Sequence, residues 1–175
     1  MATNEFFAKI CDIEAIINNS SKAFTGGKSG ELFVEYVENE NICLTNGVLT
    51  NCVANQSSGF GLRSYLGDKF SYIHSSDLSE DSVKNAVKES EIASRFYGES
   101  ICHGGKIVRQ NIDQNLYPSD KFIASLSLQD KIDFLHKLEA KVREKSQNVQ
   151  TVTSRLVSSW QVVLGAKNNG VTVGD

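Results

Sequence analysis

The chain has 175 residues, a net charge of −3 and an apolar fraction of 40%, values typical of one soluble globular domain or two small ones. The acidic balance and the scattered lysines and arginines argue against a nucleic-acid-binding surface. No apolar run approaches the roughly 20 residues that a membrane helix needs, and the N-terminus lacks a basic signal-peptide region. We therefore expect a cytoplasmic protein that binds neither nucleic acid nor membrane, with its four cysteines reduced because they form no Cys-x-x-Cys pair.

The N-terminal part of the chain predicts a helix followed by strands. Residues 4–22 carry a broad apolar stripe that is typical of an amphipathic helix. Residues 31–38 are rich in β-forming side chains and predict a strand. Residues 41–44 and 48–54 flank Asn46-Gly47, a dipeptide that strongly predicts a two-residue hairpin turn. These two segments are therefore expected to pair.

A second hairpin follows. Side chains alternate with a period of two over residues 60–65 and 69–74, and Gly67-Asp68 between these arms suits a type II′ turn. Gly59 and Gly61 are unfavourable in an ordinary strand, so they predict a bulge or a close backbone approach. With this hairpin about five strands are joined by tight turns, which indicates a largely antiparallel sheet.

Two more helices and a long connection come next. The acidic capping signal at residues 77–80 starts a helix that ends near Gly98. Residues 98–126 hold two adjacent glycines and the only proline, and they predict an irregular connection. A further helix opens at residues 127–130 and carries an apolar face: Leu128, Ile132, Leu135, Leu138 and Val142.

The end of the chain predicts strands near residues 149–157 and 160–166, and a last strand begins at 171–173. This strand pattern breaks off as it starts, which indicates a chain cut at the start of a following domain.

This order of elements indicates an α+β fold, a largely antiparallel sheet of tight hairpins packed by three helices. We expect one domain over residues 1–175. Helix, hairpins and helix lie in residues 1–97, the irregular connection in 98–126, and a helix and strands in 127–175.

The residues that could carry chemistry form no catalytic group. None of His74, His103 and His136 has partners at metal-ligand spacing, and a zinc site needs three or four convergent ligands. Cys102 and His103 are adjacent, so on an extended chain their side chains point to opposite faces. Phosphate-loop and nucleophile-elbow motifs are absent. We therefore assign no catalytic and no metal-binding residue to this chain.

Three features of the sequence occur in an order that resembles a known family. They are the strand pair 32–36 and 42–47, the stretch 59–72 with the helix start at 77–79, and the later segments 126–132, 142–143 and 149–152. Taken together, the chain resembles the N-terminal domain of the TldD/PmbA family, and the later segments resemble TldD more than PmbA.

The resemblance implies the N-terminal part of a longer bacterial or archaeal cytosolic peptidase, a protein type also called a modulator of DNA gyrase. In that family TldD carries zinc on a His-Glu-x-x-x-His motif in its C-terminal domain and acts on unfolded peptides with a PmbA/TldE-like partner subunit. This sequence lacks that motif, so no catalytic or metal residue is carried over and no cofactor is expected in this part. The implied role is to wall the substrate cavity and to help pair the subunits.

Two classes of function remain open from the sequence. In the first, the chain is an accessory domain of a zinc peptidase that binds extended peptide by strand addition at an open sheet edge. The substrate contacts are then expected at five consecutive residues: Gly59, Phe60, Gly61, Leu62 and Arg63. Arg63 is the best candidate for binding a carboxylate, with a plain surface arginine as the alternative. In the second class, the chain is a non-enzymatic interaction module of the gyrase-modulator type.

Overall fold

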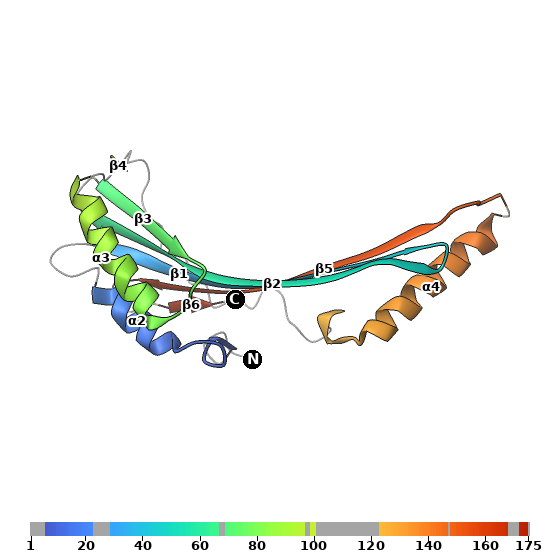
Figure 1. Cartoon of the computed structure of the whole chain (residues 1–175), viewed down its shortest axis with the longest axis horizontal. Helices are drawn as coiled ribbons and strands as arrows, with labels where there is room; N and C mark the ends of the chain where they lie inside the picture. Colours follow the sequence, from blue (N-terminus) through green and yellow to red (C-terminus); the bar gives the residue numbers. More distant parts are fainter. Residues whose placement is uncertain are drawn as a thin grey trace. The chain divides into compact units, whose positions relative to one another are not determined.

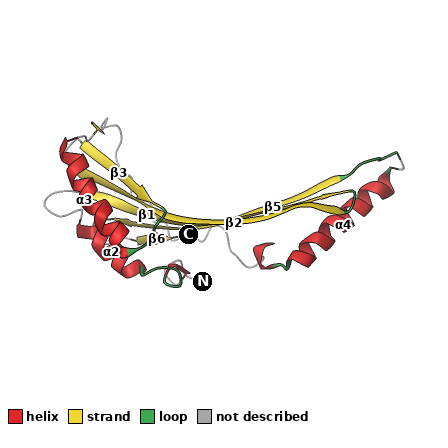
Figure 2. Cartoon of the chain, in the orientation of Figure 1, coloured by secondary structure: helices red, strands yellow, loops and turns green. Residues whose placement is uncertain are grey.

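The computed structural model describes residues 6–22, 29–66, 69–96, 99–100, 123–146, 148–167 and 172–174 (Figure 1). In chain order the described elements are α2 (Ile13–Lys22), β1 (Ser29–Thr45), β2 (Val48–Leu66), β3 (Lys69–Ser75), α3 (Glu80–Phe96), β4 (Glu99–Ser100), the 3-10 turn η1 (Ile123–Ser125), α4 (Leu128–Lys145), β5 (Thr153–Lys167) and β6 (Thr172–Gly174). The six described strands form one sheet in the order β4-β3-β2-β1-β5-β6 (Figure 2). The β2–β3, β3–β4 and β5–β6 pairs are antiparallel, which confirms the predicted α+β fold.

The chain divides into two compact units. Unit 1 comprises residues 1–36, 57–115 and 162–175, and unit 2 comprises residues 37–56 and 116–161. The three long strands β1, β2 and β5 contribute residues to both units. Residues 101–122, which include Cys102, His103 and most of the predicted irregular connection, lie outside the described residues.

The hairpin at Asn46-Gly47 is confirmed. Asn46 has a φ of +49° and Gly47 a φ of +74°, the two positive values that a type I′ turn requires. The second hairpin is confirmed by the register of β2 on β3, in which Leu66 lies opposite Lys69. The type II′ turn predicted for this hairpin falls on residues 67–68, which lie outside the described residues.

The predicted number of strands is wrong. Residues 31–38 and 41–44 belong to one strand, β1, because nothing between them interrupts the extended backbone. Residues 48–54 and 59–65 are likewise continuous in β2, and the two segments predicted near the C-terminal end form the single strand β5. The residues between the predicted segments, 39–40 in β1 and 55–58 in β2, are mostly polar, and an extended strand continues through them.

The single helix predicted over residues 4–22 is also wrong. The helix α2 begins only at Ile13, because the Asp12 carboxylate accepts a hydrogen bond from the backbone N–H of Ala15 at 3.0 Å. This is the bond of a helix N-cap, and it separates α2 from the turn formed by Phe6–Cys11.

In unit 1, α2 and α3 lie on one face of the sheet formed by β1, β2 and β3 (Figure 1). The core between these layers consists of side chains that are at most 4% exposed: Phe7, Ile13, Ile16, Leu32, Val34, Phe60, Leu62, Val83 and Ala86. The small residues predicted on α3 allow close packing, and Ser90 lies against Ser64 and Ser71 in a buried hydroxyl cluster. Each hydroxyl in this cluster has a hydrogen-bond partner, so its burial is compensated.

In unit 2, α4 packs on β1 and β5 around a small core of Ile42, Leu44 and Leu135. Ser127 caps the start of α4 as predicted, since its hydroxyl accepts the N–H of Asp130 at 3.1 Å.

The predicted apolar face of α4 is largely wrong. The buried residues are Lys131, Leu135 and Glu139, whereas three of the five predicted residues are exposed: Leu128, Leu138 and Val142. Lys131 faces the strands because it forms an ion pair with Glu40 of β1. Glu139 pairs with Arg143 one turn further along the same helix, and the Arg143 guanidinium also bonds Asn46.

Candidate functional site

The five predicted substrate residues lie on β2 in unit 1, and their side chains face opposite sides of the sheet. Phe60 is 4% exposed and Leu62 is fully buried beneath the helices. Arg63 faces the other side and is exposed to solvent. Of the two apolar side chains and the arginine, only Arg63 can therefore contact a molecule from solution.

Strand addition at this stretch is excluded. From Phe60 to Leu66, β2 pairs along one side with β3, and its other neighbour in the sheet is β1. The backbone there consequently offers no open edge, which strand addition requires. The binding positions stay a prediction, and Arg63 is the one of the five whose side chain lies on the exposed surface of the sheet.

Arg63 belongs to a group of polar and aromatic side chains on this surface. Its Nη1 atom lies 3.1 Å from Glu31 Oε1, and its guanidinium lies 5.9 Å from the centroid of the Tyr72 ring. The Tyr72 ring in turn stacks on His74 with a centroid distance of 5.9 Å. A hydrogen bond with Tyr65 and the charge of Glu31 raise the pKa of Arg63, so the guanidinium stays cationic. We call Glu31, Arg63, Tyr72 and His74 the Arg63 surface.

The close backbone approach predicted at the two glycines is confirmed at Gly59, whereas the close neighbour of Gly61 is a side chain. A Cβ atom at Gly59 would lie 2.7 Å from the carbonyl oxygen of Ser75, and one at Gly61 would lie 2.9 Å from ring carbons of Tyr72. The register between β2 and β3 advances one residue at a time from Phe60, so this part of β2 contains no bulge. Gly61 thus leaves space for the aromatic ring of the Arg63 surface.

These contacts predict different effects for two alanine substitutions. Gly59→Ala is expected to lower the free energy of unfolding by about 2 kcal/mol, because the new methyl group meets rigid backbone. Gly61→Ala should cost less than about 1 kcal/mol, because Tyr72 is exposed and its ring can move aside. Urea unfolding measures the first difference, and the NMR shifts of His74 report the lost stacking in the second. Equal destabilisation by both substitutions would contradict this account.

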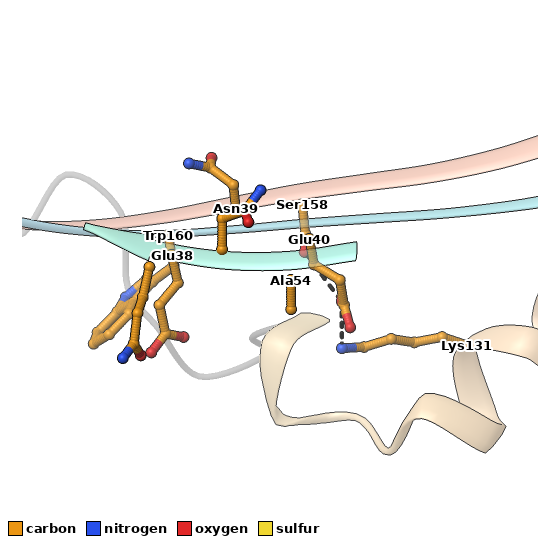
Figure 3. A pocket seen from close by; sticks show the side chains of 9 residues that line it. Glu38, Asn39, Glu40, Ala54, Lys131, Ser158 and Trp160 are labelled. Atoms are coloured by element: carbon orange, nitrogen blue, oxygen red, sulfur yellow. Dashed lines mark hydrogen bonds and ion pairs between the residues drawn. The ribbon is translucent and has the colours of Figure 1, made fainter. Parts of the chain in front are cut away.

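A pocket of about 470 Å³ lies in unit 2 and was not anticipated from the sequence (Figure 3). It is bounded by β1, β2, β5 and α4, and its lining residues are Glu38, Asn39, Glu40, Ala54, Asn55, Gln56, Lys131, Ser158 and Trp160. Glu38 and Glu40 are two residues apart on β1 and therefore share one face of the strand. Figure 3 shows that Glu38, Glu40 and Trp160 project to the side on which Lys131 lies.

A buried ion pair closes one end of this pocket. Lys131 is 4% exposed, and its Nζ atom lies 2.6 Å from Glu40 Oε2. The Ser158 hydroxyl donates to the same oxygen at 3.4 Å. A lysine at a helix position that faces the sheet was the one sequence signal that could have pointed to this site, because such a cation needs a partner.

Comparison with known proteins shows which family the chain is similar to. Residues 30–94 match PmbA/TldA metallopeptidase domain 1. Over 148 residues the chain is 24% identical to a metalloprotease TldD homolog of Buchnera aphidicola, a match that covers 83% of this chain and 30% of that relative. These matches support a TldD/PmbA-type N-terminal domain, and the resemblance drawn from the sequence is confirmed.

Solved structures share the fold over 93% of this chain. A protein called a modulator of DNA gyrase from Bacteroides thetaiotaomicron is 15% identical with a TM-score of 0.69, and one from Thermotoga maritima is 16% identical with a TM-score of 0.68. TldE from Thermococcus kodakarensis is 16% identical with a TM-score of 0.63. The chain spans about a third of the length of these relatives, 37% of the first structure and 36% of the other two.

The described residues do not fit the metal that the family name implies. No group of three or more His, Cys, Asp or Glu side chains among them is placed to hold a metal ion. A protein zinc site needs three or four such ligands, and the described residues do not supply them in one place. The same part of the chain has no helix that is long and apolar enough to cross a membrane.

Proposed function

We propose that this chain is the N-terminal, non-catalytic part of a cytoplasmic TldD-like zinc metallopeptidase that degrades unfolded peptides. Its role is to form part of the wall of the substrate cavity and to help pair with a PmbA/TldE-like subunit. The match to a metallopeptidase domain supports the enzyme class, and the similarity to the TldE structure supports the partner type.

The observation that carries the substrate role is the Arg63 surface. It lies within the segment that matches the family's first domain, on the sheet face opposite α2 and α3. A guanidinium carries five N–H donors, and charge-assisted hydrogen bonds to carbonyl or carboxylate oxygens are among the stronger polar contacts. The exposed Tyr72 ring adds apolar area beside these donors. An extended peptide presents both carbonyl oxygens and apolar side chains to such a surface.

The experiment uses the complete gene product mixed with its partner subunit and an unfolded peptide. Arg63→Ala is expected to raise KM about tenfold, the loss of one charge-assisted hydrogen bond, with kcat changed less than about twofold. Arg155→Ala is the matched control, since Arg155 is an exposed arginine of unit 2 whose Nε atom bonds Asn41 Oδ1 at 2.7 Å. An unchanged KM in Arg63→Ala would remove the substrate role from this surface.

The second candidate is a non-enzymatic interaction module of the gyrase-modulator type. Two structural relatives are called modulators of DNA gyrase, which favours this candidate, as do exposed apolar side chains on α4 such as Phe134 at 57% and Leu138 at 43% exposure. Zinc content and peptide hydrolysis of the complete protein with its partner separate the two candidates. About one zinc per chain and hydrolysis that stops on chelation support the peptidase, and the absence of both supports the interaction module.

A further inference from the structure

The part of β2 that belongs to unit 2 has an open edge. Ser75, the last residue of β3, lies opposite Phe60, so β3 does not extend beside the earlier residues of β2. Among the described residues, β1 is therefore the only strand beside Val48–Asn55. A strand with a single neighbour leaves every second N–H and C=O group of its backbone without a partner in the sheet.

The Asn46-Gly47 turn determines which backbone groups face this edge. In a two-residue hairpin the residues that flank the turn bond each other, and along each strand such residues alternate with others whose N–H and C=O groups point away. Thr45 and Val48 flank the turn, so the next bonded pair is Cys43 with Thr50. The Thr50 hydroxyl donates to the Cys43 carbonyl at 3.1 Å, which agrees with this register. The backbone groups that point to the open edge are therefore those of Leu49, Asn51 and Val53.

This edge lacks the usual protection against pairing with another chain. Proteins commonly place charged side chains or proline on their edge strands. No residue of Val48–Asn55 is charged or a proline, and three of its apolar side chains are exposed by 41% or more: Val48, Leu49 and Val53. An uncharged and partly apolar edge favours the addition of a further strand.

The pocket of unit 2 lies at one end of the edge. Ala54, labelled in Figure 3, and Asn55 line it, and its volume of about 470 Å³ is in the range of sites that hold small molecules. Side chains of an added strand alternate between the two faces of the sheet, so every second one points to the face on which the pocket lies. The pocket can thus accept a side chain of the molecule whose backbone the edge bonds.

The length of the edge favours a peptide over a second copy of this chain. The eight residues of Val48–Asn55 span about 26 Å, and an edge contact about 10 Å high buries about 500 Å² in total. A stable dimer buries about 1,200 Å² or more. Backbone pairing of this extent suits weak binding that tolerates many sequences, as a protein that acts on unfolded peptides requires.

We propose that the open edge Val48–Asn55 binds an extended peptide by strand addition, through the backbone groups of Leu49, Asn51 and Val53. The inference rests on the proposed function for the identity of the ligand as a peptide, and it goes further by naming the strand edge that holds the peptide backbone. The affinity then depends mainly on the N–H and C=O groups of the peptide.

The test compares peptides that differ only in their backbone N–H groups. The 175-residue chain is titrated with a fluorescein-labelled peptide of alternating valine and threonine with a lysine at each end, and binding is followed by fluorescence anisotropy. N-methylation of two adjacent central residues blocks both edges of the peptide and is expected to weaken binding about tenfold. N-methylation of two central residues separated by one residue blocks a single edge and should change the affinity about twofold or less. Equal affinities, or no binding of the unmodified peptide, would overturn the proposal.

Two variants at one position locate the site on the chain. Asn51→Pro removes an N–H group that points to the open edge, where an edge strand tolerates proline. It is expected to weaken binding of the unmodified peptide about tenfold, whereas Asn51→Ala keeps the N–H group and should retain wild-type affinity. Wild-type affinity in Asn51→Pro would overturn the assignment of this edge.

Hydrogen exchange on the unaltered chain locates the contact if Asn51→Pro fails to fold. The amides of Leu49, Asn51 and Val53 are expected to exchange about tenfold more slowly when the unmodified peptide is bound. Unchanged exchange at these amides would contradict the proposal. A second copy would be the occupant if the mass of the chain in sedimentation rose with concentration, Asn51→Pro abolished the rise and no peptide bound.

Binding is measured without hydrolysis, so failure of the edge leaves the peptidase proposal standing. Conversely, a complete protein without zinc or hydrolysis can still bind the peptide at this edge, in which case the peptide would be a ligand and not a substrate.

Discussion

Replacing Glu40 with glutamine is expected to lower the free energy of unfolding by about 3 kcal/mol, because it leaves the ammonium of Lys131 buried without a counter-charge. The Lys131 side chain is 5% exposed, so water cannot replace the lost carboxylate. Lys131→Met should cost less, about 1 kcal/mol, because the Glu40 side chain is 21% exposed and keeps the Ser158 hydroxyl as a donor. Urea unfolding followed by Trp160 fluorescence measures both changes.

The double variant Glu40→Gln, Lys131→Met is the control for this asymmetry. It removes both charges, so we expect it to be more stable than Glu40→Gln alone. Two outcomes would show that Lys131 stabilises the fold mainly by packing and not by its charge. In one, the losses of unfolding free energy of the two single variants add up in the double variant. In the other, Lys131→Met loses more than Glu40→Gln.

Truncation of Leu135 to alanine is expected to cost about 3 kcal/mol, because it empties the centre of a small core. Leu135 is 1% exposed and packs with Ile42 and Leu44, and among the described residues Ile132 and Leu156 are the partly buried apolar side chains that surround this cluster. So small a core has little other apolar surface to hold α4 on the strands. Hydrogen exchange should therefore show lost protection in the amides of α4.

Leu62→Ala is the matched control in unit 1, where Leu62 is fully buried beneath the helices. It should raise exchange in the amides of α3 and leave those of α4 protected. If either truncation removes protection from both helices together, the two units unfold as one cooperative body, and the division into separately stabilised units is wrong.

The sequence alone predicted those features whose cause lies within a few residues. Asn46-Gly47 specifies its hairpin because both residues tolerate positive φ, and Ser127 starts α4 because its hydroxyl reaches the N–H of Asp130. The close contact at Gly61 could also be predicted, because glycine destabilises a strand unless a neighbouring group needs the space. The family resemblance rests on the order of such local features along the chain.

The strand lengths were predicted wrongly, because they depend on more than a few neighbouring residues. Polar residues between two apolar segments can mark a turn or the solvent side of a continuous strand, and local pattern does not separate the two. In β1 and β2 the strands continue because neighbouring strands supply hydrogen-bond partners along their length. The strand-addition hypothesis failed for the same reason, since the position of β2 inside the sheet depends on distant pairing.

The sequence by itself thus determined the fold class, the Asn46-Gly47 hairpin turn and the family. Only the tertiary structure decided which face of α4 is buried. That choice also forms the pocket of unit 2, because Lys131 on the buried face lines it. Lys131 and Glu40 are 91 residues apart in the chain, and their attraction exists only after α4 has packed on β1. A helix's own apolar periodicity cannot reveal this choice, because the free energy of a buried charge depends on the partner that the rest of the fold brings to it.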